Sequence, residues 1–192
     1  APVRLGDPDQ PMMMTHTSGT TGTPKLVVQS ARTLREASRL ELMRLPLVVS
    51  RRKDTVLSSI SFAHWRAATW IVAQVKFAPA KLVVVADHAP DNVARMLTEH
   101  RPTSVEACPN VFQRWRPLTR SHAEVLSQVR LYMSTFDMIH PPTVRAFLEA
   151  SRRRLPLWVA SWGQSESGPI SSAIFTRRRL RRVGTAVTSD VG

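Results

Sequence analysis

Short apolar runs rich in β-branched residues alternate with segments of helical periodicity along most of the chain, and this alternation constrains the fold more than any other feature. The predicted strands span residues 54–60, 81–86, 103–107, 129–134 and 155–161. The predicted helices span residues 32–43, 65–77, 91–100, 110–115, 121–128 and 143–153. Such alternation is typical of an α/β fold with a mostly parallel sheet flanked by helices, whose functional loops lie at the carboxyl ends of the strands.

Two of the predicted helices have features that can be checked. Ser30 precedes the helix at 32–43 as its expected N-cap. The helix at 65–77 is apolar on nearly every side, which predicts that it is buried.

The composition is that of a globular protein. The chain has 192 residues, of which 43% are hydrophobic, enough for one substantial core. A single cysteine, Cys108, excludes an internal disulfide and suits a reducing cytoplasm. The longest uncharged stretch around Trp70, between Arg66 and Lys76, is too short to span a bilayer, and the N-terminus lacks the layout of a signal peptide. We therefore expect a cytoplasmic protein with no membrane span.

The chain is strongly basic. It has 27 Lys and Arg against 14 Asp and Glu, a formal net charge of +13. Much of this charge lies in runs at residues 51–53, 152–154 and 177–182. Such runs are either a footprint for nucleic acid or the solvated ends of helices and loops. The second interpretation is favoured because no RNA- or DNA-binding motif accompanies them, and nucleic-acid binding stays the weaker alternative.

A polar segment at residues 15–25 predicts a phosphate-binding loop. Gly19 and Gly22 permit positive φ, so that successive backbone N–H groups can converge on an anion. Lys25 adds a full positive charge. The segment is not a Walker A loop, because Pro24 stands where that motif has its second glycine. A surface loop without a ligand is the alternative.

A second polar segment, residues 160–168, follows the strand predicted at 155–161. It brings the hydroxyl of Ser165 and the carboxylate of Glu166 to the carboxyl end of a core strand, within reach of a triphosphate and its magnesium ion. It is not a nucleophile elbow, because Gly168 stands one position too late for G-x-S-x-G. A purely structural loop is the alternative.

Together the two segments resemble the signatures of the adenylate-forming superfamily, which includes acyl-CoA synthetases and the adenylation domains of nonribosomal peptide synthetases. Residues 17–25 fit the pattern T-S-G-[ST]-T-G-x-P-K-G at every defined position, and Leu26 replaces its last glycine. In the second pattern, Y-G-x-[ST]-E, Trp162 replaces the tyrosine. The positions that match are Gly163, Ser165 and Glu166.

The resemblance implies a role for each matching residue. The residues expected at the β- and γ-phosphates of ATP are Thr17, Ser18, Gly19, Thr20, Thr21, Gly22 and Lys25. Lys25, Ser165 and Glu166 are the expected catalytic residues, with Ser165 on phosphate and Glu166 on Mg²⁺. The other residues expected around the nucleotide are Thr135, Phe136, Asp137, Trp162, Gly163 and Gln164.

The acid substrate is expected to lie near a different set of residues, namely His64, Trp65 and Ser161. His64 has an equally simple structural interpretation as a hydrogen-bonded core histidine. At residues 134–137 the glycines usual in the family are absent, and Phe136 either lines the adenine or blocks it.

The resemblance also implies a reaction. A carboxylate attacks the α-phosphate of ATP, giving an acyl-adenylate and pyrophosphate, and the acyl group then passes to coenzyme A or to the phosphopantetheine of an acyl- or peptidyl-carrier protein. Residues 1–192 would form the central portion of the large N-terminal domain of such a ligase, with the lysine-bearing small C-terminal domain outside this chain. A degenerate, non-catalytic nucleotide-binding or interaction domain is the alternative.

Overall fold

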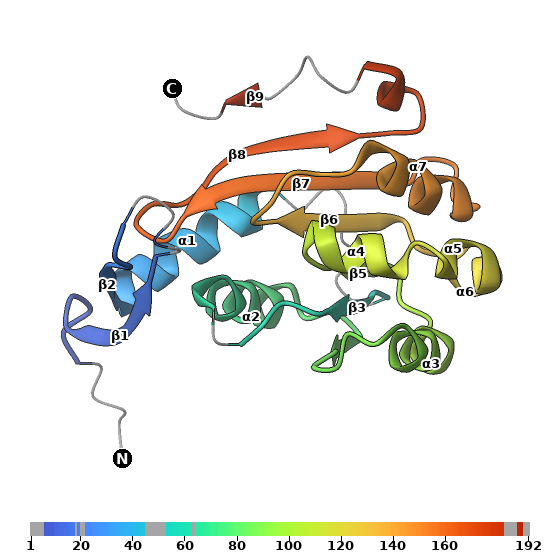
Figure 1. Ribbon diagram of the computed structural model, residues 1–192. Coiled ribbons are helices and arrows are strands. Elements are labelled where there is room, and N and C mark those ends of the chain that lie inside the picture. Colours follow the sequence, from blue (N-terminus) through green and yellow to red (C-terminus); the bar gives the residue numbers. More distant parts are fainter. Residues whose placement is uncertain are drawn as a thin grey trace.

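The fold consists of one seven-stranded sheet covered by helices and a separate two-stranded hairpin (Figure 1). The computed structural model describes residues 6–17, 19, 22–44, 53–62, 64–182 and 188–189. The hairpin pairs β1 (Pro11–His16) antiparallel with β2 (Leu26–Ser30). The strands of the larger sheet are β3 (Thr55–Ser58), β4 (Lys81–Val84), β5 (Ser104–Glu106), β6 (Leu131–Thr135), β7 (Leu157–Gln164), β8 (Gly168–Phe175) and β9 (Thr188–Ser189).

Helices alternate with the first five strands of that sheet. They are α1 (Ala31–Arg44), α2 (Trp65–Phe77), α3 (Pro90–His100), α4 (Pro109–Trp115), α5 (Leu118–Ser121), α6 (Ala123–Leu126), α7 (Pro141–Ala150) and the short 3₁₀ helix η1 (Arg179–Arg182). The strand order is β4-β3-β5-β6-β7-β8-β9. The strands from β4 to β7 are parallel, so their carboxyl ends lie along one edge, whereas β8 and β9 join antiparallel.

Alternate residues of β6 face opposite sides of the sheet. Tyr132 packs into the larger hydrophobic cluster together with side chains of α3 to α7, whereas Leu131 and Met133 pack with Ala73 and Phe77 of α2. Because successive strand side chains point to opposite faces, α3 to α7 cover one face and α2 covers the other. The molecule therefore has three layers, and the α/β fold with a mostly parallel sheet that the sequence predicted is confirmed.

A buried ion pair ties together the amino ends of β3, β5 and β6. The carboxylate of Asp54, a residue only 2% exposed, pairs with the guanidinium of Arg130. The same carboxylate accepts a hydrogen bond of 2.7 Å from Oγ1 of Thr103. This contact fixes the edge of the sheet opposite the carboxyl ends of the strands.

Of the two predicted helix features, the N-cap is confirmed and the burial holds in part. The helix predicted at 65–77 has those same bounds and buries seven of its side chains, whereas Val75 is 69% exposed. Ser30 caps α1, since its Oγ accepts a hydrogen bond from the N–H of Thr33 at 3.3 Å. Among the described residues no helix is both long and apolar enough to span a bilayer.

Other predicted elements need correction. The predicted helix at 121–128 is replaced by the single turns α5 and α6, because His122 between them leaves helical geometry with φ −128° and ψ 33°. The strand predicted at 155–161 begins only after Pro156 and continues to Gln164. Strand β8 was not predicted, because its serines leave no continuous apolar run.

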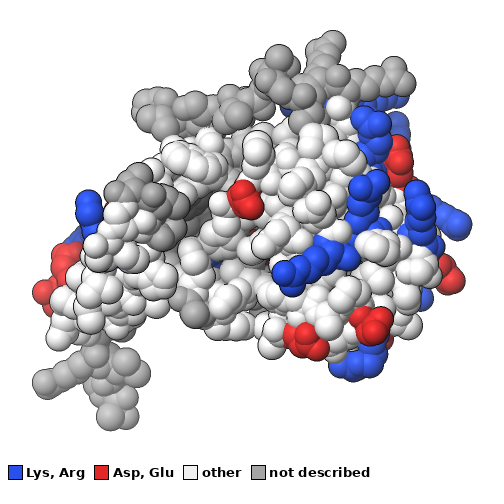
Figure 2. Space-filling model, viewed as in Figure 1, with Lys and Arg blue, Asp and Glu red and all other residues white. Residues whose placement is uncertain are grey.

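Two of the arginine runs are partly structural. The guanidinium of Arg177 donates to the carbonyl groups of Leu148, Ser151 and Arg153 at the C-terminal end of α7. Nε of Arg153 donates to the carbonyl of Gln128 at 3.0 Å. Lys and Arg gather on the right of the face in Figure 2, where α5 to α7 lie. For these two arginines the contacts match the helix-end interpretation; Arg51 and Arg52 lie outside the described residues.

Candidate functional site

The loop between β1 and β2 carries the first predicted motif. Its neck is closed by the N–H of Thr17, which donates to the carbonyl of Lys25 at 2.9 Å, and by the N–H of Lys25, which donates to Oγ1 of Thr17 at 3.0 Å. The hydroxyl of Thr17 is therefore used to shape the loop, and Lys25 is exposed where the loop ends. Three predicted phosphate ligands lie outside the described residues, namely Ser18, Thr20 and Thr21.

Inside this loop, Gly19 occupies a position that only glycine fits. Its φ of +69° lies in the left-handed region, and its carbonyl accepts a hydrogen bond of 3.1 Å from the N–H of Gly22. A Cβ at Gly19 would lie 2.7 Å from Cγ of Pro24 and 2.9 Å from the carbonyl oxygen of Gly22, closer than carbon atoms pack. Both the backbone conformation and the available space therefore demand a glycine here.

The second predicted motif forms the turn between β7 and β8. Ser165 and Glu166 lie in this turn, which closes where Gln164 pairs with Gly168 at φ +72°. Ser165 is partly buried and Glu166 is exposed. Trp162 is 52% exposed and precedes an irregularity in the strand register. The remaining predicted residues of the motif, both exposed at the end of β7, are Gly163 and Gln164.

A hydrogen bond joins the second motif to β2, the strand that follows the first motif. Nε2 of Gln29, a residue of β2 that is only 4% exposed, donates to the backbone carbonyl of Ser165 at 3.0 Å. A Cβ at Gly168 would lie 3.7 Å from Cβ of Ala37 in α1, so the helix also packs against the turn. The β1–β2 hairpin therefore meets the β7–β8 turn at one end of the sheet, as Figure 1 shows.

His64 is the N-cap of α2. Its Nδ1 accepts a hydrogen bond of 3.1 Å from the N–H of Arg66. The proton of the neutral ring therefore lies on Nε2. Desolvation of the ring lowers the pKa of His64 below its usual 6.5, and the charges of Arg66 and of His16 lower it further.

Phe136, directly after β6, has a backbone conformation that is rare for any residue except glycine. Its φ is +84°, a conformation that costs a bulky residue about 1–3 kcal/mol. The centroid of its ring lies 4.3 Å from that of His64 with an interplanar angle of 76°, an edge-to-face contact. The chain thus keeps a glycine-like backbone at this turn but carries a large ring there, 42% exposed.

Four further predicted residues lie near the same edge of the sheet. Thr135 and Ser161 are register partners at the ends of β6 and β7, and Oγ of Ser161 is hydrogen bonded to Oγ of Ser172 at 3.0 Å. Asp137 accepts a hydrogen bond of 2.7 Å from the N–H of Met138. Trp65 is only 5% exposed and belongs to the core at the start of α2.

Sequence reasoning missed a buried ion pair beneath His64. Glu106 at the end of β5 is 1% exposed, and it pairs with Nη2 of Arg66 at 2.5 Å and accepts a hydrogen bond of 3.3 Å from Ser58. A buried charge is tolerated only when it is paired and hydrogen bonded. The signal was present in the sequence, where Glu106 is the one carboxylate in the apolar run 103–107.

Cys108, two residues after Glu106, is not an activated thiol. Burial raises the pKa of its thiol to about 11, and the charges of Glu106 and Asp137 contribute in the same direction. A thiol with this pKa stays protonated at neutral pH and is a poor nucleophile. Cys108 packs, partly buried, against the larger hydrophobic cluster.

The exposed carboxylate of Glu166 fits a magnesium ion that is bound mainly by a nucleotide. Within the described ranges no group of three or more His, Cys, Asp or Glu is arranged to hold a metal ion. Mg²⁺ typically keeps several waters and takes one or two carboxylates together with phosphate oxygens. Glu166 is therefore suited to be a single protein ligand of a nucleotide-bound Mg²⁺.

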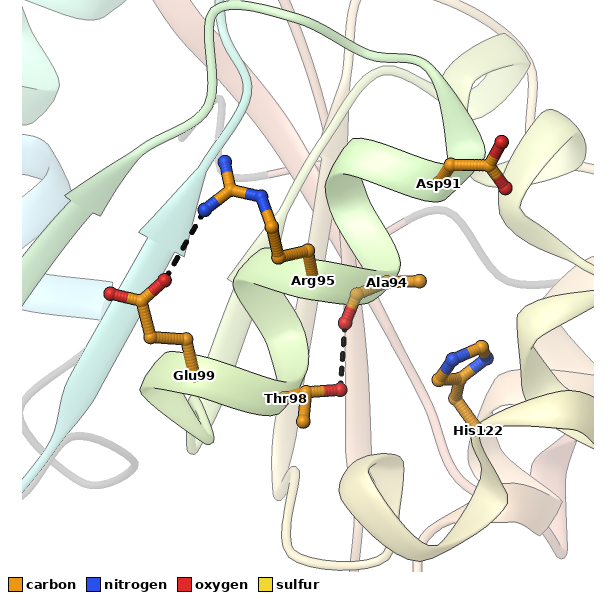
Figure 3. A pocket seen from close by; sticks show the side chains of 6 residues that line it. All are labelled: Asp91, Ala94, Arg95, Thr98, Glu99 and His122. Carbon is orange, nitrogen blue, oxygen red and sulfur yellow. Dashed lines mark hydrogen bonds and ion pairs between the residues drawn. The ribbon is translucent and has the colours of Figure 1, made fainter.

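A shallow pocket of about 450 Å³ lies elsewhere, along α3. In Figure 3 the side chains of α3 line one side and His122, from the turn between α5 and α6, lines the other. The residues on α3 are Asp91, Ala94, Arg95, Thr98 and Glu99. The six residues drawn include no residue predicted for the site, so this pocket is separate from the junction of the two motifs.

Comparison with known proteins agrees with the motifs. The family model described as AMP-binding enzyme matches residues 1–191. The chain is 35% identical over 178 residues to 3-amino-2-hydroxy-4-methoxybenzoate diazotase of Streptomyces cremeus, covering 92% of this chain and 31% of that enzyme. It is 28% identical over 160 residues to the medium/long-chain-fatty-acid–CoA ligase FadD8 of Mycobacterium tuberculosis, covering 83% of this chain and 27% of that ligase. The chain thus spans less than a third of the length of these two relatives.

A solved structure agrees with the fold. The structure described as McyG A-PCP complexed with phenylalanyl-adenylate superposes with a TM-score of 0.75 at 16% sequence identity. The superposition covers 96% of this chain and 35% of that one. At this identity the likeness establishes a shared fold.

Proposed function

The chain belongs to the AMP-binding enzyme family, and on this premise we propose that it contributes the nucleotide site of an enzyme that activates a carboxylic acid with ATP. A carboxylate oxygen attacks the α-phosphorus of ATP, the bond from that phosphorus to the bridging oxygen breaks, and pyrophosphate leaves with the electron pair. The product is an acyl-adenylate. The observation that carries the proposal is the hydrogen bond from Gln29 to Ser165, because it ties β2, the strand that follows the first motif, to the turn that carries the second motif.

Electrostatics decides what such a site must supply. The carboxylate and ATP are both anions, so the protein has to offset their repulsion and stabilise charge on the departing pyrophosphate. We assign Lys25 and the backbone N–H groups around Gly19 and Gly22 to the β- and γ-phosphates. Ser165 is assigned to a phosphate oxygen and Glu166 to Mg²⁺, which when bound would neutralise charge on the phosphates.

The remaining residues are assigned to the base and to the acid. Trp162 is exposed at the end of β7 and offers a ring on which adenine can stack. Thr135 and Phe136 are assigned to the space beside the adenine. His64 and Ser161 are assigned to the acid, with His64 donating a hydrogen bond from Nε2; Trp65 supports this pocket from the core.

A thiol is the proposed acceptor of the acyl group. The relative from Mycobacterium tuberculosis is named as a CoA ligase. We propose coenzyme A as the acceptor, with the phosphopantetheine of a carrier protein as the alternative. In either case the thiolate attacks the acyl carbon, a thioester forms and AMP leaves.

A second candidate function is favoured by the relative from Streptomyces cremeus, which is named as a diazotase. A diazo group contains one nitrogen more than the amine from which it is made, and nitrite is an oxyanion able to supply it. Nitrite can attack the α-phosphorus just as a carboxylate does, again releasing pyrophosphate. Attack of an arylamine on the activated nitrogen would then release AMP, and loss of water would leave the diazonium group.

ATP–pyrophosphate exchange tests the proposed function. We expect the intact protein to support exchange that depends on a carboxylic acid, and we expect Lys25→Ala and Glu166→Ala each to lower the rate by about 100-fold, because each removes a charge interaction with the phosphates. Matched controls are Lys76→Ala and Glu149→Ala, which remove exposed charges on α2 and α7 and should leave the rate unchanged.

The same assay separates the two candidate functions. Exchange that requires a carboxylic acid and ignores nitrite supports acyl activation. Release of pyrophosphate that requires nitrite, together with consumption of an aromatic amine, would support the diazotase function instead. Normal exchange in both site variants would refute the assignment of Lys25 and Glu166.

A further inference from the structure

We propose that Phe136 is a specificity-determining residue whose ring, held against His64, closes the acid pocket to extended chains and leaves room for compact acids. The inference rests on the proposed function, because it takes His64 to border the acid. Phe136 lies in the segment 134–137, where the adenylate-forming superfamily usually has a glycine-rich turn.

The ring of Phe136 is fixed in place. Its contact with His64 is direct, with ring centroids 4.3 Å apart. His64 cannot easily turn away, because its Nδ1 caps α2 by accepting the N–H of Arg66. Arg66 is itself anchored through its guanidinium to the buried carboxylate of Glu106. The aromatic pair is thus tied to the core of the molecule.

The ring of Phe136 also lies between residues assigned to the acid. Phe136 directly follows Thr135, which pairs in register with Ser161 at the ends of β6 and β7. Its ring contacts that of His64, which precedes α2. A side chain at this position occupies volume next to the proposed acid and nucleotide.

The left-handed backbone conformation of Phe136 is kept at a cost in conformational free energy. Left-handed backbone at a bulky residue persists only where its surroundings hold it, and such positions concentrate at functional sites. A glycine would adopt this conformation without strain and leave the volume of the ring empty. A ring at this position therefore takes away room that a glycine would give to the substrate.

Two substitutions at this position separate the effect of the ring from the effect of the strain. Phe136→Gly removes the ring and releases the backbone, whereas Phe136→Ala removes the ring and keeps the left-handed strain. Equilibrium binding of benzoate and octanoate to the intact protein, in the presence of a non-hydrolysable ATP analogue, gives a selectivity ratio for each variant. Leu155→Ala, at an exposed residue before β7, is the control.

We expect both variants to shift the ratio of affinities toward octanoate by at least 10-fold, as removal of a steric wall does, while Leu155→Ala keeps the wild-type ratio. We also expect Phe136→Gly to melt at a higher temperature than Phe136→Ala. An unchanged ratio in both variants would overturn the inference, even if the wild type catalyses exchange. Conversely, a shifted ratio in a protein that gives no exchange with any acid would uphold Phe136 as a wall of the pocket and refute the proposed function.

Discussion

At the scale of single residues, two positions with positive φ differ in how far they could be anticipated. Gly19 stands in a motif whose glycines predict such a turn, and the close approach of Pro24 explains why no other residue fits. Phe136 adopts the same region of backbone space although this chain has no glycine there, because its conformation is imposed by the surrounding fold. Sequence therefore identified the turn that glycine permits, and missed the one that the fold enforces.

His64 provides a prediction about pH at this scale. Because its pKa is lowered in the folded protein, the unfolded chain binds more protons between that lowered value and about 6.5. The stability that depends on neutral His64 is therefore complete above about pH 6.5 and is lost as the pH falls through the lowered pKa. His64→Asn keeps an acceptor for the cap of α2 but does not titrate.

Chemical denaturation at pH 8 and pH 5 checks this expectation. The free energy of unfolding of the wild type should fall more between these two pH values than that of His64→Asn. Equal losses in the two proteins would show that the imidazole does not contribute to the pH dependence.

At the scale of elements, the two motifs meet because β2 and the β7–β8 turn are joined. The position of the second motif after a strand could be predicted from the sequence, whereas β2, the strand that follows the first motif, was not among the predicted strands. The contact itself could not be predicted, because Gln29 is a single polar side chain whose partner is a backbone carbonyl in Ser165. Strand β8, which creates the turn, was also missed, since Ser171 and Ser172 interrupt its apolar character.

Loss of this contact should impair both stability and ATP binding. Gln29→Ala leaves the carbonyl of Ser165 without its partner, which we expect to lower the free energy of unfolding by about 1–3 kcal/mol and to weaken ATP binding, because the two motifs are no longer held together. Gln113→Ala, at an exposed position of α4, is the matched control and should change neither quantity. Calorimetric titration with ATP and a denaturation curve give both values; unaltered ATP affinity in Gln29→Ala would mean that the junction does not organise the site.

At the scale of the whole molecule, the two edges of the parallel sheet have separate tasks. The edge formed by the amino ends of the strands is held together by the buried ion pair of Asp54 and Arg130. The edge formed by their carboxyl ends carries the candidate site. The layered α/β architecture follows from strand and helix periodicity and could be predicted. The difference between an edge that stabilises the fold and an edge that carries the candidate site depends on buried charges such as Asp54 and Glu106. Hydrophobic periodicity does not reveal these charges.

Removing the charge at the amino edge should destabilise the fold and spare the site. Asp54→Asn leaves Arg130 without its buried counter-charge, and we expect a loss of about 3–5 kcal/mol in the free energy of unfolding. Glu99→Gln, which breaks the exposed pair with Arg95 on α3, should cost no more than about 0.5 kcal/mol. Below the unfolding temperature, ATP affinity should be unchanged in both variants, and a reduced affinity in Asp54→Asn would show that the two edges are coupled.

The central claim is that two segments far apart in the sequence form one site for ATP, and a structure of the intact protein with ATP and Mg²⁺ tests it most directly. We predict that the triphosphate lies between the loop at 17–25 and the β7–β8 turn, with Lys25 on the β- or γ-phosphate and Glu166 on the metal ion. A nucleotide that contacts only one of these segments, or that occupies the pocket along α3 instead, would contradict the account.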